Sequence, residues 1–312
     1  MIVAERRSAG EHVPVMVAEV LDGLALAPGM TVVDATLGMA GHSLAFLEAV
    51  GPSGRVIGLD RDPAALAAVE AMLGPDRIEL VHAGFADLAA VLAQRAPHGV
   101  DALFLDLGVS RDQLVSERFS FQGRGELDFR LDPGQGESAA DVLARLGEEE
   151  LADLLFTLGD ERFSRRIARG IVEARAAAPV RSADQLVEIV RRAYPANARH
   201  GRMHVATRTF QALRLFVNHL LDDLERVLAE APECLKPGGR WGVLTYHSGE
   251  AARTKFAFRD LVRGGGWERV TARAQKPSEA ECRSNPGARS AQWRVIAKRD
   301  AAAASESQRS ES

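Results

Sequence analysis

Two glycines, followed about twenty residues later by an acid, form the first pattern in this chain that can do chemistry. An apolar run at 31–35 leads into a turn with Gly38 and Gly41, and the next apolar run ends at Asp60. Backbone N–H groups at such a turn can meet an anionic or polar ligand, and glycine allows close approach. An acid at this spacing suits a ribose diol. The pattern predicts a site for a cofactor that contains a nucleoside.

Strands that alternate with helices would hold these residues in place. The apolar runs that read as strands lie at 31–35, 55–60, 78–82, 100–106, 240–246, about 267–272 and about 291–298. The first four alternate with helical segments, which predicts an α/β fold with a parallel sheet and helices on both faces. Ligands of such sheets bind beyond the carboxyl ends of the strands, where the strand order reverses.

The alternation stops at about residue 112, and no strong strand pattern returns before 205. Because helical runs fill this stretch and its flanks resume sheet character, we expect an inserted all-helical domain above the cofactor crevice. The expected parts are a flexible N-terminus at 1–11, a cofactor-binding domain at 12–111 and 206–299, the insertion at 112–205 and a disordered tail at 300–312. One long amphipathic helix is predicted at 207–228.

Charge is distributed unevenly over the 312 residues, whose formal net charge is −4. Residues 160–214 contain 12 Arg and no Lys against 5 acidic residues, and residues 273–299 contain 7 basic residues against 2 Glu. Two basic segments on an acidic body can guide a polyanion to one face. A solvated helix surface explains the same charges, so charge alone leaves both interpretations open.

The composition argues against several classes of protein. No apolar run is long enough to span a bilayer, and the N-terminus lacks the apolar core of a secretion signal. Cys234 and Cys282 lie far apart and outside any metal-ligand spacing. We therefore expect free thiols in a reducing cytoplasm and no metal site.

Short motifs separated along the chain carry a resemblance to a known family. Among them are His12-Val13-Pro14-Val15, Asp34-Ala35-Thr36-Leu37-Gly38, Gly41-His42-Ser43, Asp60-Arg61-Asp62-Pro63, Leu105-Asp106-Leu107-Gly108-Val109-Ser110, Gly159-Asp160-Glu161-Arg162-Phe163, Ala206-Thr207-Arg208-Thr209-Phe210-Gln211-Ala212-Leu213-Arg214, His247-Ser248 and Asn285-Pro286. From about residue 12 to 299, the chain resembles the RsmH (MraW) family of S-adenosylmethionine-dependent ribosomal RNA methyltransferases.

The resemblance implies a class I methyltransferase fold and methyl transfer to N4 of a cytidine in the decoding centre of bacterial 16S rRNA. It implies that the substrate is an assembled or nearly assembled small ribosomal subunit, with no membrane and no metal involved. We expect a monomer or weak homodimer. The cofactor contacts that carry over by motif position are Gly38, Ala40, Gly41, His42, Asp60, Phe85, Asp106 and Gln113.

Three of these cofactor residues also have a purely structural interpretation. Asp60 could help Asp62 to cap a helix. Phe85 could lie in the core instead of against adenine, and His42 could cap the helix after the glycine turn.

The chemistry of the methyl acceptor predicts catalytic residues at the ends of two further strands. N4 of cytosine is a poor nucleophile because its lone pair is delocalised into the ring, so an oxygen that accepts an N–H proton would help. Asp106 is the first candidate, although it could mainly bind the cofactor. His247 is the second candidate and could equally anchor the turn that follows it. Asn218 and Ser248 are candidates to orient either group.

A base stacked in RNA cannot reach a buried methyl donor, so the target nucleotide must be splayed out or single-stranded. Phe119 and Phe121 could stack on it or pin their loop to the core. Arginines at helical spacing are candidates to bind phosphates, and some could instead pair with Asp160 or Glu161. The candidates are Arg162, Arg165, Arg166, Arg169, Arg208 and Arg214.

Departures from the family pattern keep other functions open. Met39 and Ala40 stand at usual glycine positions, where a positive φ would be costly for alanine. Residues 249–252 differ from the family's Leu-Glu-Asp-Arg. A non-catalytic ribosome-assembly factor, or a methyltransferase with another RNA target, is compatible with both. A nicotinamide dehydrogenase shares the generic fold but lacks the full glycine fingerprint.

Overall fold

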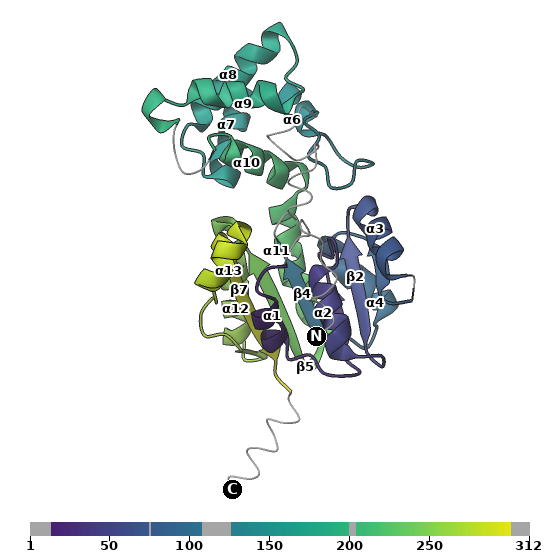
Figure 1. The fold of residues 1–312 in the computed structure, drawn as a ribbon. Coiled ribbons are helices and arrows are strands. Elements are labelled where there is room, and N and C mark those ends of the chain that lie inside the picture. The colour runs from purple at the N-terminus through teal and green to yellow at the C-terminus, as the bar shows by residue number, and fades with distance from the viewer. Residues whose placement is uncertain (1–13, 75, 108–125, 200–203, 301–312) are drawn as a thin grey trace. The chain divides into compact units, whose positions relative to one another are not determined.

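The computed structural model describes residues 14–74, 76–107, 126–199 and 204–300. The chain divides into two compact units. The first is formed by Met1–Gly108 with Asp222–Ser312, and the second by Val109–Leu221. Figure 1 shows that the first unit contains the sheet and that the second consists of helices.

The described strands form one sheet in the first unit (Figure 1). They are β1 (Thr31–Asp34), β2 (Arg55–Asp60), β3 (Glu79–His82), β4 (Val100–Asp106), β5 (Leu235–Thr245), β6 (Trp267–Arg269) and β7 (Gln292–Lys298). Their order is β3-β2-β1-β4-β5-β7-β6. Strands β1 to β5 run parallel, and β7 is antiparallel to β5 and β6. The predicted parallel sheet is confirmed, and its order reverses between β1 and β4.

The helices of this unit are α1 (Val17–Leu24), α2 (Gly41–Val50), α3 (Pro63–Leu73), α4 (Leu88–Arg95), α11 (Leu220–Glu230, which starts in the second unit), α12 (Ser248–Arg263) and α13 (Glu279–Ser284). Figure 1 shows α1 and α2 in front of the sheet.

Side chains alternate between the two faces of the sheet, and both faces are buried. Val32 of β1 and Phe104 of β4 join one core with residues of α1, α2 and α3. Leu103 points to the opposite face and is also buried. There Trp241 of β5 packs against Phe258 of α12, with ring centroids 5.0 Å apart. Helices therefore cover both faces, as the sequence predicts.

The buried indole of Trp293 in β7 occupies space that two glycines leave open. A Cβ on Gly242 of β5 would lie 1.8 Å from Cη2 of this ring. A Cβ on Gly23 of α1 would lie 2.8 Å from its Nε1. Both positions need glycine because the ring fills the place of a side chain.

The helices of the second unit surround a hydrophobic core of their own. They are α6 (Ala139–Arg145), α7 (Glu148–Gly159), α8 (Ser164–Ala177), α9 (Ala183–Ala193) and α10 (Thr207–Val217). The predicted insertion ended at 205, but the compact unit extends to Leu221 and includes α10. At Gly159 of α7, an added Cβ would lie 2.6 Å from the carbonyl oxygen of Arg208. This close approach packs α10 onto α7.

The single long helix predicted at 207–228 is wrong, because the chain breaks at Asn218 and His219. The amide nitrogen of Asn218 donates to the carbonyl oxygens of Arg214 and Phe129, at 2.9 and 2.7 Å. His219 follows with a left-handed φ of 51°. A side chain that binds nearby backbone groups competes with the helix, which here ends at Val217.

No helix in the described parts of the chain is long and apolar enough to cross a membrane.

We predict that Gly242→Ala lowers the free energy of unfolding by about 3 kcal/mol or more, because its methyl group would overlap the Trp293 ring. Urea titration followed by tryptophan fluorescence measures the change. Gly266→Ala is the matched control, since a Cβ there meets no atom within 4 Å, and it should change the stability by less than about 1 kcal/mol. Equal stability of the two variants would contradict the packing described for Trp293.

Candidate functional site

Three acids stand at the carboxyl ends of neighbouring parallel strands. Asp34, Asp60 and Asp106 end β1, β2 and β4, which lie side by side in the sheet. Tyr246 and His247 follow the adjacent strand β5. Parallel strands bring these residues to one edge, where the strand order reverses and ligands of open sheets bind.

The glycine turn after β1 is tied to Asp60. The Gly38 N–H donates to Oδ2 of Asp60 at 2.7 Å, and the Asp62 N–H donates to Oδ1 at 2.8 Å. Burial raises the pKa of Asp60, and these backbone N–H groups oppose the rise. Asp62 itself caps α3 by accepting the Ala64 N–H at 2.9 Å. Asp60 therefore organises the turn, and the helix cap belongs to Asp62.

Ala40 adopts the left-handed conformation, with φ 60° and ψ 23°. It precedes α2 and is fully buried. A left-handed conformation costs a residue with a Cβ roughly 1–2 kcal/mol. Alanine at this position therefore costs conformational energy that glycine would not, and the surrounding turn must hold Ala40 in this conformation.

Asp34 is a buried acid that the sequence analysis did not single out. It accepts the Ser43 hydroxyl at 2.7 Å and the Thr36 N–H at 3.2 Å. Burial raises its pKa to about 6, and the Ser43 hydrogen bond opposes the rise. Thr36 in turn accepts the backbone N–H of Asp106 at 2.7 Å. The ends of β1 and β4 are linked through this turn.

Asp106 is held by Tyr246, a second residue that the sequence analysis missed. The Tyr246 hydroxyl donates to the Asp106 carboxylate. Burial and the charge of Asp106 raise the pKa of Tyr246 far above its usual range, so it stays a hydrogen-bond donor. Its place directly after a buried strand and before His247 was the only sequence signal for it.

His42 is buried in the first turn of α2. Its Nε2 lies 2.9 Å from the carbonyl oxygen of Val15, so this nitrogen carries a proton and donates. Nδ1 lies 3.8 Å from Oδ2 of Asp106, and the ring packs 4.6 Å from that of Phe104. These contacts of His42 join the chain before α1 to the sheet.

Glu250 fixes the backbone that carries His247. Its Oε2 accepts the N–H groups of Tyr246 and His247 at 3.0 and 3.2 Å. Burial raises the pKa of Glu250 to about 7, and these two hydrogen bonds oppose the rise. His247 is the residue that precedes α12, which supports an anchoring role for its backbone.

Phe85 is buried after β3, with the Arg61 guanidinium 6.0 Å above its ring. Arg61 also pairs with Asp223. Gln113, Phe119 and Phe121 lie outside the described residues. Asn218 uses its amide inside the second unit, where its Oδ1 accepts the Leu131 N–H at 2.8 Å.

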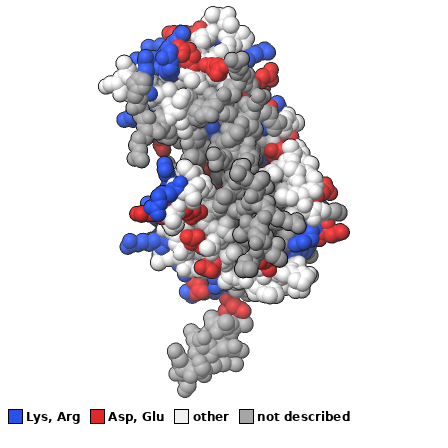
Figure 2. Space-filling view, viewed as in Figure 1, with Lys and Arg blue, Asp and Glu red and all other residues white. Residues whose placement is uncertain are grey.

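The arginines of the second unit have different surroundings. Arg162, Arg165, Arg166 and Arg169 are exposed, and Arg169 lies 3.4 Å from Glu148. Arg208 is half-buried on α10. Figure 2 shows basic and acidic side chains intermixed over the α8–α9 end of this unit.

Arg214 was predicted to contact RNA, but it is buried, with its guanidinium 5.9 Å above the Phe129 ring. Burial lowers its pKa to about 10, and its Nε has no hydrogen-bond partner among the described residues. We withdraw it from the RNA-binding set, because its charge is not presented at the surface.

This sheet order, with an antiparallel β7 beside β5 and acids around a glycine turn at the carboxyl edge, defines a class I methyltransferase with a helical insertion. Comparison with known families identifies the family within this class. The MraW methylase family matches residues 9–299, so the chain belongs to this family.

Curated relatives span nearly the whole chain. Ribosomal RNA small subunit methyltransferase H of Synechococcus sp. is 44% identical over 92% of this chain and 92% of its own. The protein of the same name from Pelobacter propionicus is 42% identical over 92% of this chain and 98% of its own. Among solved structures, an rRNA methylase from Streptococcus thermophilus matches 94% of this chain and 100% of its own at 13% identity, with a TM-score of 0.39.

The residues at the carboxyl edge fit S-adenosylmethionine, the cofactor of this class. A Cβ added to Gly38 would meet no atom within 4 Å, so a ligand can approach the backbone there. Asp60 lies beside this turn, and Asp106 lies across β1 from it. Carboxylates suit both ribose hydroxyls and a sulfonium cation. In the described residues, no group of three or more His, Cys, Asp or Glu side chains is placed to hold a metal ion.

We predict that the free energy of unfolding falls as pH rises from about 4.5 to 7, because Glu250 binds its proton more tightly in the folded state. The rise of its pKa from 4.5 to about 7 corresponds to a change on the order of 3 kcal/mol. Glu250→Gln keeps an oxygen that can accept both N–H groups but cannot titrate, so the variant should show a shallower fall. Denaturant titrations at pH 5 and pH 8 measure it. The residual slope reports Asp34, whose pKa is about 6, and Asp60, whose pKa burial also raises; both act with the same sign. An identical fall in variant and wild type would contradict the assignment.

Proposed function

We propose that this chain transfers the methyl group of S-adenosylmethionine to N4 of a cytidine in the decoding centre of 16S rRNA. Its membership of the MraW methylase family and the name of its relatives, ribosomal RNA small subunit methyltransferase H, support the substrate. The observation that carries the mechanism is the position of Asp106 at the carboxyl edge of the sheet, where its backbone N–H donates to Thr36 at 2.7 Å and its Oδ2 lies 3.8 Å from Nδ1 of His42.

Asp106 is the proposed proton acceptor for the reaction. The bound cofactor supplies an activated methyl group on a sulfonium. The Asp106 carboxylate accepts an N–H of the target amine, which localises the nitrogen lone pair for in-line attack. Tyr246 holds the carboxylate, and the Asp106 backbone is held through Thr36. A carboxylate in a fixed position raises the rate, because positioning of donor and acceptor supplies much of the rate of such a transfer.

The cofactor is assigned to the turn and to the acids beside it. In this assignment, the backbone of Gly38, Ala40 and Gly41 contacts the cofactor. The Asp60 carboxylate faces the ribose and also accepts the backbone N–H groups that hold the turn. The insertion is assigned to RNA recognition, with the exposed Arg162, Arg165 and Arg166 as contacts to phosphates. The substrate in this proposal is a small ribosomal subunit in the cytoplasm.

We predict that Asp106→Ala lowers kcat for methylation of 30S subunits at least about 100-fold, because the proton acceptor is lost. Tyr246→Phe keeps the carboxylate but loses its hydrogen bond, so kcat should fall only about threefold to tenfold. Transfer of a tritiated methyl group, with the modified base identified by mass spectrometry, gives both numbers. Asp22→Ala, which removes an exposed carboxylate of α1, is the control and should leave kcat unchanged.

Calorimetry with S-adenosylmethionine separates loss of chemistry from loss of cofactor. Wild type without measurable cofactor binding would sink the proposal and favour a non-catalytic assembly factor. Full activity of Asp106→Ala would leave the methyltransferase intact but remove Asp106 from its mechanism.

A further inference from the structure

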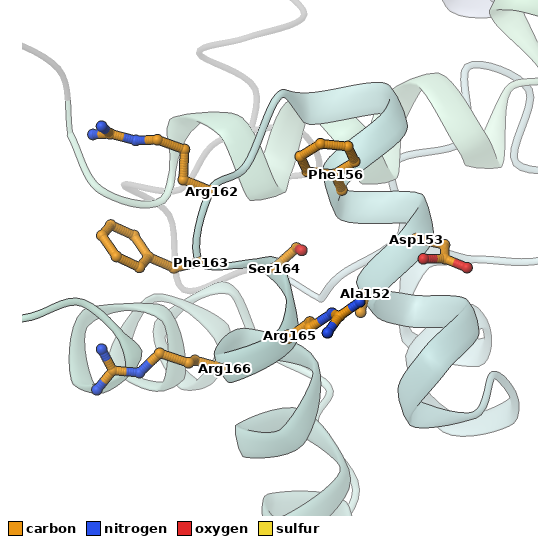
Figure 3. A pocket seen from close by; sticks show the side chains of 8 residues that line it. All are labelled: Ala152, Asp153, Phe156, Arg162, Phe163, Ser164, Arg165 and Arg166. Atoms are coloured by element: carbon orange, nitrogen blue, oxygen red, sulfur yellow. The ribbon is translucent and has the colours of Figure 1, made fainter.

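We infer that a pocket between α7 and α8 of the second unit binds one nucleotide of single-stranded RNA, with Phe156 as the surface on which its base stacks. The inference rests on the proposed function and adds a site to it. The pocket has a volume of about 380 Å³, within the range of ligand sites. Its walls are Ala152, Asp153 and Phe156 on α7 and Ser164, Arg165 and Arg166 on α8 (Figure 3).

Phe156 lies on the face of α7 that points away from the hydrophobic core of the unit. Leu151, Leu154 and Leu155 are buried in the unit's core, whereas Phe156 is 62% exposed. The helix therefore packs without this ring, which leaves one aromatic face open to a ligand. An open aromatic ring beside cations is the usual platform for an unpaired base.

Ion pairs engage several arginines of this unit but not Arg165 and Arg166, which line the pocket. Arg169, Arg191 and Arg192 each lie within ion-pair distance of a glutamate. Arg165 and Arg166 are exposed, and no carboxylate of the described residues lies within 4.0 Å of either guanidinium. The charge of Arg165 is thus available to a phosphate near the exposed ring, and Arg166 adds a second cation to the lining of the pocket.

The lining of the pocket indicates where the base and the phosphates of a bound nucleotide lie. Figure 3 shows Arg165 extending from α8 toward α7, while Arg162 and Arg166 point to the other side. Asp153 lines the α7 wall, where its charge disfavours a phosphate but can accept an amine of a base. The base therefore lies toward Phe156, and the phosphates lie toward the start of α8, whose N-terminus also favours an anion.

Buried contacts hold the turn before α8 and thereby fix the backbone that carries the arginines. Glu161 is fully buried and accepts the Tyr194 hydroxyl at 2.7 Å and the Phe163 N–H at 2.9 Å. The Phe163 ring packs 4.5 Å from that of Tyr194. This buried acid supports the turn from below and leaves the guanidinium groups of Arg162 and Arg165 outside. Because the backbone of the turn is already held, binding RNA has to order only the side chains.

Three variants of the full chain test the inference. Phe156→Leu keeps an apolar side chain but removes the stacking surface, Phe156→Trp restores it, and Arg165→Ala removes one cation. Arg192→Ala is the control, because it removes an equal charge from α9 at a site paired with Glu188. The probes are a fluorescein-labelled ten-residue oligocytidylate for binding, whose bases carry an amine, and 30S subunits for methylation.

Phe156→Leu should weaken oligonucleotide binding about fivefold to 100-fold with an unchanged salt dependence, and Phe156→Trp should recover it. Arg165→Ala should weaken binding and lower the slope of log K against log salt by about 0.7. On 30S subunits both losses should raise KM with kcat unchanged, and Arg192→Ala should change neither.

Unchanged binding and KM in Phe156→Leu, with active wild type, would overturn the nucleotide pocket alone. Loss of binding that Phe156→Trp does not restore would also overturn it, because stacking is the claim. Wild type that binds the oligonucleotide with the expected dependence on Phe156 but methylates no 30S subunit would overturn the proposed function and leave the pocket standing.

Discussion

Hydrogen bonds to both neighbouring strands hold the turn after β1, and the candidate site depends on them. Gly38 donates to Asp60 at the end of β2, and Thr36 accepts from Asp106 at the end of β4. Regular pairing of β1 ends at Asp34, so these hydrogen bonds keep the turn fixed to β2 and β4 beyond the end of the strand. The cofactor turn and both acids thus keep one geometry, which methyl transfer needs because donor and acceptor must be in line.

The same edge concentrates acid groups in a buried place. Burial raises the pKa of Asp34, Asp60 and Glu250, which means that their negative charge opposes folding at neutral pH. Backbone N–H groups and the Ser43 hydroxyl offset part of this cost. A cationic ligand offsets more, so a site of this kind is stabilised when a sulfonium-bearing cofactor binds the folded state.

The second unit uses arginine for three different purposes. Arg214 packs against Phe129 in the interior, and Arg169 pairs with Glu148 at the surface. Arg165 and Arg166 keep their charge exposed beside Phe156. The excess of arginine in this segment therefore overstates the charge exposed at the surface, and the exposed arginines beside the pocket are the ones that we propose for RNA recognition.

The sequence by itself determined the α/β alternation, the helical insertion, the glycine turn with Asp60 and the family, because hydrophobic periodicity and short motifs are local properties. Tertiary structure decided what depends on residues far apart in the chain. The hydrogen bond of Tyr246 to Asp106 requires β4 and β5 to pair in register, and the helix break at Asn218 requires the carbonyl group of Phe129. The burial of Arg214 and the exposure of Phe156 likewise depend on how α7, α8 and α10 pack, because helical spacing alone does not say which neighbours a face will meet.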